Sequence, residues 1–388
     1  MTSLPVWAVY APIPEQEQGK DLTISIKGGL SYDSNIFGAA NGAVHSTIWT
    51  IAPRAAYNAS LTDQTFLAAS YGLTVDYFED RPGDKSLDSH DATLRVAHAF
   101  SKETTIDVNN AFTISRNPES ALAGRTVNQD QSFTRNQLDG RFNTPLNAKV
   151  AATVKARSVY LKYREDLLSR SLDRIENLFG LSGDYAILPE VKAIGEYRHQ
   201  DVFYRKLGET KNKSSEYLMG GVDYDVARKL SLSGRLGAEW RERKAEKDTT
   251  APYVEFSAKY NYTERSFFVG GYAYTLEETS QPERFTDAKV HRVFVNVQHA
   301  VTALIVASAS LTYEPSTLQG RRDPSALQGL PPIPNVSETT VRAGAALSYL
   351  PTKNWRTSAS YDFDHVRSDE ASRKLRRERV ALSATYTF

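Results

Sequence analysis

Apolar and polar residues alternate along this chain in one segment after another, and this pattern limits the possible folds more than any other feature. The final segment, VALSATYTF at residues 380–388, is a simple example. Val380, Leu382 and Tyr386 fall on one face of an extended strand, whereas Ser383 and Thr385 fall on the other face. A period of two residues predicts β-strands.

Similar segments follow one another from residue 22 to residue 388. Most are near or above the ~9–11 residues that cross a bilayer as a tilted strand. The pattern predicts roughly eighteen strands, at residues 22–33, 46–58, 64–77, 90–100, 104–115, 132–142, 147–162, 173–186, 190–203, 215–226, 230–242, 251–262, 265–277, 287–299, 303–314, 337–349, 354–366 and 376–388.

Short and long connections alternate between these segments. Tight turns are expected at sites such as 101–103, 227–229 and 263–265, and the longest connections are expected at 116–131 and 314–336. Such a chain runs up and down, with its turns at one end and its loops at the other. Outer-membrane barrels have this arrangement and an even number of strands.

The composition excludes several other classes of protein. The chain has 388 residues, a net charge of +1 and no cysteine, so nothing favours a nucleic-acid partner, a disulfide framework or a thiolate metal site. The mean hydropathy is −0.45, and no run of ~18 apolar residues predicts a membrane helix. A membrane β-barrel remains possible, because its apolar lipid-facing residues and polar lumen-facing residues alternate and together give an ordinary mean hydropathy.

The positions of the aromatic residues distinguish a membrane barrel from a soluble β-sandwich, which also alternates. Aromatic side chains suit the lipid headgroup level, so a barrel should carry them near strand ends on the apolar face. Such positions are held by Tyr32, Tyr57, Tyr77, Tyr185, Tyr224, Trp240, Tyr262, Tyr349, Trp355 and Phe388. The sequence therefore predicts an all-β, transmembrane, up-and-down antiparallel barrel in a bacterial outer membrane.

Charged residues occupy the opposite face of the predicted strands. They would be costly in lipid but not in a water-filled lumen. The residues predicted to line the pore are Lys149, Lys155, Arg157, Arg198, Arg235, Glu239, Arg241, Arg342, Arg356 and Asp362. Two compatible interpretations follow: salt bridges that stabilise the wall, and a charged pore with a mild basic excess. The long connections at 116–131 and 314–336 are candidates to constrict such a pore.

An enzymatic function has little support in the sequence. The seven histidines lie in no recognisable motif, and the chain contains no HExxH, GxSxG or phosphate-binding loop. We therefore predict a protein that is not an enzyme and needs no cofactor or metal.

The two ends of the chain carry separate predictions. Residues 1–20 lack a basic segment followed by a long apolar one, so they read either as the remnant of a signal peptide or as a polar extension, with the barrel spanning 21–388. The terminal Phe388 on an alternating strand resembles the C-terminal signal that the barrel-assembly machinery of bacteria reads.

The stretch 28-GGLSYDSNIFG-38 carries a family resemblance. Its Tyr32, Asp33, Asn35 and Ile36 resemble the Tyr-Asp-x-Asn-hydrophobic element near the start of the type 2 outer-membrane β-barrel porins, some of which are encoded with exopolysaccharide secretion systems. Asp33 and Asn35 are themselves expected to cap backbone groups at the outer end of the first strand.

The resemblance implies a passive conduit with no catalytic residue. Its expected partners are outer-membrane lipid and lipopolysaccharide, the assembly machinery and polysaccharide export proteins. Two functions remain open: a pore for polar solutes or for polysaccharide export, and a plugged barrel that serves as a structural or assembly platform.

Overall fold

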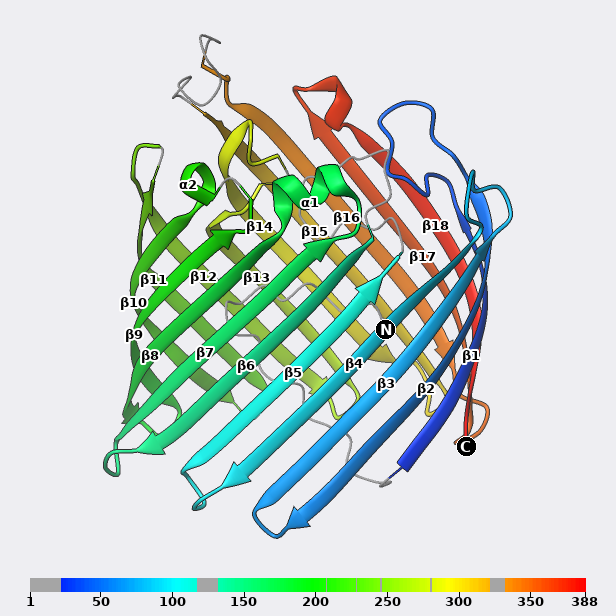
Figure 1. Ribbon diagram of the computed structural model, residues 1–388. Helices are drawn as coiled ribbons and strands as arrows, with labels where there is room; N and C mark the ends of the chain where they lie inside the picture. Colours follow the sequence, from blue (N-terminus) through cyan, green and yellow to red (C-terminus); the bar gives the residue numbers. More distant parts are fainter. Residues whose placement is uncertain are drawn as a thin grey trace.

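The computed structural model describes residues 22–116, 132–206, 208–227, 229–244, 246–279, 281–321 and 332–388. These residues form one antiparallel sheet of 18 strands, in which each strand pairs with its neighbours along the chain. The sheet closes into a barrel because β1 pairs with β18 as well as with β2 (Figure 1). The predicted up-and-down barrel of about eighteen strands is confirmed.

The strands are long, and every predicted strand is present. In chain order they are β1 (Leu22–Asp33), β2 (Ser46–Thr62), β3 (Thr65–Phe78), β4 (Ser86–Ala99), β5 (Thr105–Ser115), β6 (Phe133–Pro145), β7 (Val150–Tyr163), β8 (Arg174–Leu188), β9 (Val191–Tyr204), β10 (Lys213–Ala227), β11 (Leu230–Arg243), β12 (Thr249–Thr263), β13 (Ser266–Glu277), β14 (Phe285–Ala300), β15 (Ile305–Gly320), β16 (Val336–Tyr349), β17 (Trp355–Ser368) and β18 (Leu375–Thr387).

Short helices occur in three of the connections at the loop end. They are α1 (Asp166–Leu172), α2 (Gly208–Lys211) and a 3₁₀ helix, η2 (Ala371–Arg373). The carboxylate of Glu165 caps α1 by accepting from the Leu168 amide at 2.8 Å, and Leu168 and Leu172 pack on Tyr163 of β7. Among the described residues, no helix is long and apolar enough to cross a membrane.

The outer face of the barrel is apolar. Along β11, for example, Leu236 (65% exposed) and Trp240 (43%) point outward, while Arg235 and Glu239 point inward. A closed barrel that exposes this much apolar surface requires lipid around it, because soluble proteins rarely expose large contiguous apolar patches. The chain is therefore an outer-membrane barrel, and its exposed aromatic residues near both strand ends fit the headgroup levels.

The alternation reverses near the loop ends of the strands. Ile48, Phe78 and Leu87 point inward there and pack together, whereas Thr47 and Asp88 face outward. Above the hydrocarbon layer, water or lipid headgroups surround the outer face, so polar residues are favoured outside and apolar side chains pack inside. Similar inward clusters form around Phe285, Tyr163 and Tyr217.

This reversal explains where the predicted connections were too long. The strand β4 begins at Ser86, within the connection expected at 78–89. The strand β15 continues to Gly320, so the connection expected at 314–336 is shorter as well. Leu318 faces inward in this extension, so the strand there no longer keeps its apolar residues on the outer face.

Candidate functional site

The inner wall of the barrel is polar, and its two halves differ in exposure to water. In the half nearer the short turns, several inward-facing strand residues are more than a third exposed. In the half nearer the loops, most inward-facing charged residues are buried and paired. The lumen is therefore open to water in the half toward the short turns, and packed side chains fill it in the half toward the loops.

The exposed inner charges are mainly basic. The exposed inward-facing cations within the described strands are Lys27, Arg54, Arg141, Lys192, Lys259 and Arg356. The exposed inward-facing acids within the same strands are Asp91 and Asp225. We call these cations the basic wall. Because water reaches their side chains, they contribute a positive potential to the lumen rather than only to internal ion pairs.

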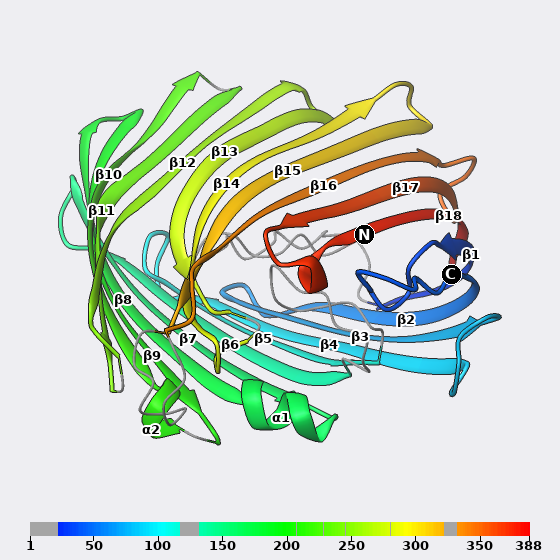
Figure 2. The same ribbon diagram turned by 90° about the horizontal axis from the view of Figure 1, so that it is seen from above.

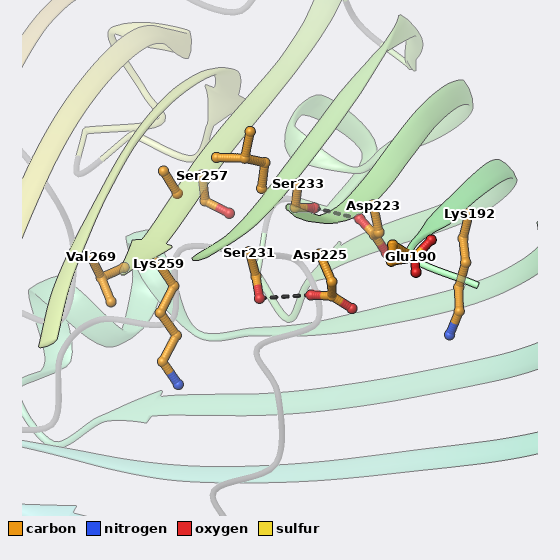
Figure 3. A pocket seen from close by; sticks show the side chains of 11 residues that line it. Glu190, Lys192, Asp223, Asp225, Ser231, Ser233, Ser257, Lys259 and Val269 are labelled. Carbon is orange, nitrogen blue, oxygen red and sulfur yellow. Dashed lines mark hydrogen bonds between the residues drawn. The ribbon is translucent and has the colours of Figure 1, made fainter. Parts of the chain in front are cut away.

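A cavity of about 320 Å³ lies in this half, against the inner faces of β9 to β13. Within it, Ser231 donates a hydrogen bond to Asp225 at 2.7 Å, and Ser233 donates one to Asp223 at 2.8 Å. The ammonium groups of Lys192 and Lys259 extend away from these bonds (Figure 3). The carboxylates of Asp223 and Asp225 are thus partly satisfied by the wall, whereas Glu190 and the two lysines remain exposed.

The filled half contains an ion-pair network that joins distant strands. The Nζ of Lys213 on β10 lies 2.8 Å from Glu278 and 3.1 Å from Asp287 of β14. Asp287 also accepts from Arg241 of β11 at 2.5 Å, and Glu278 accepts from the Tyr204 hydroxyl of β9 at 2.5 Å. Because β9 and β14 are not neighbours, these contacts require the sharp bend of the wall around β10 and β11 that Figure 2 shows. We call this set the corner network.

The connection between β13 and β14 is tied to other connections at the loop end. Glu283 accepts from Lys211 of the β9–β10 connection at 2.8 Å. Arg284 pairs with Glu370 of the β17–β18 connection at 2.7 Å. A connection held from both sides lies across part of the loop-end opening, so it can restrict passage there.

The electrostatics of the corner network depend on Glu278, which lies beyond the end of β13. Burial alone would raise the pKa of its carboxyl group, but the ammonium of Lys213 and the guanidinium groups of Arg241 and Arg174 lower this pKa from 4.5 to about 2. The charged carboxylate is therefore strongly favoured in the folded barrel.

This shift predicts a loss of stability in acid. A folded-state pKa below the unfolded value contributes stability above pH 4.5, and the contribution disappears as the pH falls from 4.5 toward 2. The full contribution is on the order of 3 kcal/mol, and about 2 kcal/mol of it should be lost between pH 6 and pH 3. Urea unfolding in detergent micelles at pH 6 and pH 3 measures it, and Glu278→Gln should show a smaller difference between the two. An equal difference in both proteins would contradict the assignment to Glu278.

Three of the predicted pore-lining cations lie on β7 and β9, in ion pairs. The Nζ of Lys155 lies 3.0 Å from Glu196 Oε1, and the Nε of Arg198 lies 2.7 Å from the same oxygen. Arg157 pairs with Asp139 of β6. These cations face the lumen, but neighbouring carboxylates compensate their charge.

Three further predicted residues lie on β11. Arg235 donates to both carboxylate oxygens of Asp223, at 2.8 and 3.0 Å. Glu239 and Arg241 are paired at 2.7 Å and are almost fully buried, with Arg241 joined to Asp287 in the corner network. The structure thus brings Glu239 and Arg241 together and places Arg235 nearer the short turns.

The last four predicted residues are dispersed. Arg342 stands opposite Asp364 in the β16–β17 register, and Asp362 is half-buried on the inner face of β17. Arg356 is exposed near the short-turn end and belongs to the basic wall. Lys149 lies in the turn before β7. The predicted set therefore contains buried pairs, half-buried residues and exposed cations, which alternation alone cannot separate.

Sequence reasoning did not single out several members of the corner network. Lys213, Glu278 and Asp287 were absent from the predicted set because each lies at or beyond the end of a strand. The buried pair of Arg292 and Glu314, 2.9 Å apart across β14 and β15, was also missed. In the sequence, the local signal for these buried pairs is a charged residue at a position where the inner face of the strand becomes apolar.

The Tyr-Asp-x-Asn element closes the seam of the barrel at its loop end. The Nδ2 of Asn35 donates to the carbonyls of Ala39 at 2.8 Å and Arg376 at 3.2 Å. Asp33 accepts from the Asn35 amide at 2.9 Å and from Arg377 Nε of β18 at 2.9 and 3.0 Å. The expected capping role is confirmed, and the element also fastens the first strand to the last.

The strand histidines lie on the outer face, away from the lumen. His90 and His291 each contact a tyrosine hydroxyl of the neighbouring strand, Tyr71 at 2.8 Å and Tyr272 at 2.9 Å. Within the described residues, no group of three or more histidine and carboxylate side chains could hold a metal ion.

The connections predicted to constrict the pore are only partly described. Residues 117–131 and 322–331 lie outside the described residues, as does the N-terminal extension at 1–20. The connection between β13 and β14 is one described segment that is tied across the loop end.

Comparisons with known proteins find distant likeness only. No family model and no curated protein matches the sequence. Similar solved structures include OccAB4 of Acinetobacter baumannii, at 11% identity over 96% of this chain and 99% of that chain with a TM-score of 0.47. OpdQ of Pseudomonas aeruginosa is 12% identical over 95% of this chain and 99% of that chain, with a TM-score of 0.48. The FrpB iron transporter of Neisseria meningitidis (F5-1 variant) is 11% identical over 95% of this chain and 83% of that chain, with a TM-score of 0.49. Likeness at this level carries no argument about function. The evidence for function is therefore the inner wall of this barrel.

Proposed function

We propose that this protein is a passive outer-membrane channel whose lumen favours small anionic solutes. The observation that carries the proposal is the basic wall, in which exposed inward-facing cations outnumber exposed inward-facing acids. A barrel of 18 strands is wide enough to enclose an aqueous channel.

The basic wall would act through its electrostatic potential. Exposed cations raise the local anion concentration in a polar channel, and salt screens this effect over a Debye length of about 8 Å at physiological ionic strength. Paired cations such as Lys155 and Arg157 contribute less, because a carboxylate lies beside each of them. Selectivity should therefore depend on the exposed residues.

The proposal predicts anion selectivity that declines with salt. Under a KCl gradient across a planar bilayer, the reversal potential should indicate preference for chloride at low ionic strength. Replacing Lys27, Lys192 and Lys259 by Gln should reduce the anion-to-cation permeability ratio by roughly twofold without unfolding the barrel. These side chains are exposed and form no salt bridge with another described residue, so their replacement should leave no buried charge unpaired.

A matched control removes the same number of lysines from the short turns. Lys102, Lys229 and Lys353 are exposed there but do not lie in the strands of the inner wall. Their replacement by Gln should leave the permeability ratio close to that of the original protein. A cation-selective channel, or equal effects in the two triple variants, would overturn the proposal.

Two other functions remain to be separated from this one. Export of a polysaccharide, which the family resemblance implies, would require polymer to pass the loop end. A plugged barrel that serves as a platform draws support from the corner network and the tied β13–β14 connection. Exclusion of neutral polymers of graded size distinguishes them: passage of large polymers favours export, and no conductance at all favours the platform. The proposal assigns no catalytic role to any residue.

A further inference from the structure

Beyond the lumen, a group of cations lies at the outer end of the barrel near the closing seam. A cavity of about 520 Å³ opens between the loop ends of β17 and β18, and Arg367, Lys374 and Arg376 are among the residues that line it. The lining also includes the imidazole of His365, whose Nδ1 is buried without a hydrogen-bond partner among the described residues. No carboxylate of the described part of the chain lines this cavity.

The two arginines belong to the outer face of the sheet. On β17, Arg367 is exposed, whereas its neighbours Val366 and Ser368 are buried on the inner face. On β18, the side chain of Arg376 is 73% exposed, and the inward-facing neighbour Arg377 is buried. Both arginines therefore point toward the membrane side of the barrel wall at the level of the outer headgroups.

These cations are only partly neutralised by the protein. Arg376 pairs with Glu378 at 2.8 Å, while Arg367 donates to the Nε2 of His365 at 3.3 Å. Among the described residues, no carboxylate is recorded within ion-pair distance of Arg367 or Lys374. A net positive charge thus remains on this part of the outer rim.

The charge of the outer rim differs between sectors of the barrel. On the outer faces of β9 and β10, Asp201 and Glu216 lie at the loop end and contact His199 at 3.0 and 2.7 Å. That sector is acidic, whereas the β17–β18 sector is basic. Cations therefore do not simply follow the headgroup level around the barrel.

The same strands also offer an apolar recess lower on the outer wall. A cavity of about 700 Å³ spans β16, β17, β18, β1 and β2, with Gly28, Ala359 and Ala384 among its small residues and Trp49 and Leu382 among the larger ones. Small side chains leave room there for hydrocarbon, and β17 and β18 run from the basic cavity to this recess.

We propose that the cavity of Arg367, Lys374 and Arg376 binds the phosphate group of a lipid in the outer leaflet, with acyl chains of that lipid in the recess below. Arginine and lysine donate charge-assisted hydrogen bonds to phosphate oxygens. The inference depends on the membrane position of the barrel but not on whether its lumen conducts.

Retention of defined lipids by the purified full-length barrel tests this proposal. The barrel is folded in phosphatidylcholine vesicles that contain either bisphosphorylated lipid A or the dephosphorylated lipid with the same acyl chains. Lipid carried through detergent extraction is then counted by native mass spectrometry. The phosphorylated lipid should be retained preferentially, and the triple variant R367Q/K374Q/R376Q should lose this preference by on the order of tenfold.

The triple variant K27Q/K192Q/K259Q is the matched control, since it removes the same number of positive charges from the lumen. It should retain the phosphorylated lipid like the original protein, and single variants at Arg367 and Lys374 serve if the triple variant does not fold. Equal retention of the two lipids, or unchanged retention in a folded R367Q/K374Q/R376Q variant, would overturn the proposal. Displacement of the lipid by inorganic phosphate would also overturn it by assigning the cavity to free anions.

Discussion

Replacement of Asp33 by Ala should destabilise the folded barrel by about 3 kcal/mol or more, because it leaves the buried guanidinium of Arg377 without its carboxylate. Both side chains are buried, and Asp33 accepts from Arg377 Nε at 2.9 and 3.0 Å. The pair joins the first strand to the last, so its loss weakens the seam at which the sheet closes. The Asn35 amide would lose its acceptor in the same variant.

Urea unfolding in detergent micelles, followed by the heat-dependent migration of the folded barrel on gels, measures this loss. Asp107→Ala is the control, since Asp107 also pairs with an arginine, Arg95, but does so between strands that are consecutive in the chain and at a half-buried site. It should cost clearly less than Asp33→Ala. Equal losses of stability in the two variants would show that the Asp33–Arg377 pair contributes no more to stability than the Arg95–Asp107 pair.

Replacement of Glu278 by Ala should open the loop end of the channel and raise its single-channel conductance at neutral pH. The carboxylate of Glu278 holds Lys213 at 2.8 Å and the Tyr204 hydroxyl at 2.5 Å, so its removal takes away two of the contacts that tie the β13–β14 connection to β9 and β10. Three cations that lower the pKa of Glu278 would then lack their shared partner, which favours rearrangement of the corner.

The control for this prediction is Glu255→Gln. Glu255 lies on the inner face of β12 and accepts from the Tyr253 hydroxyl at 2.8 Å, but it does not hold a connection in place. Its replacement should leave the conductance nearly unchanged. If Glu278→Ala folds and conducts no more than Glu255→Gln, the β13–β14 connection does not restrict the channel.

The strands and their two faces could be predicted because the information is local. In a membrane barrel each residue of a strand meets either lipid or lumen, so alternation identifies both the strand and the face on which each side chain lies. Alternation no longer predicts the two faces correctly where a strand leaves the hydrocarbon layer. There, residues such as Phe78 and Leu318 point inward and the expected polarity is reversed.

The state of the lumen could be predicted only in part. Lys155 and Lys192 both face inward by alternation, yet Lys155 lies 3.0 Å from Glu196 whereas Lys192 is exposed. Alternation reports the direction of a side chain but not its partner on another strand. The corner network is harder still, because Lys213 and Asp287 meet only through the bend of the wall between β10 and β14.

The most direct test of the central claim, a water-filled lumen lined by the basic wall, is the conductance of the folded full-length protein in a planar bilayer. The claim predicts stable conductance steps with a reversal potential that favours chloride at low salt and moves toward zero selectivity as salt is added to both sides. A bilayer that stays silent after insertion of the folded barrel, or a channel that prefers potassium at low salt, would contradict it.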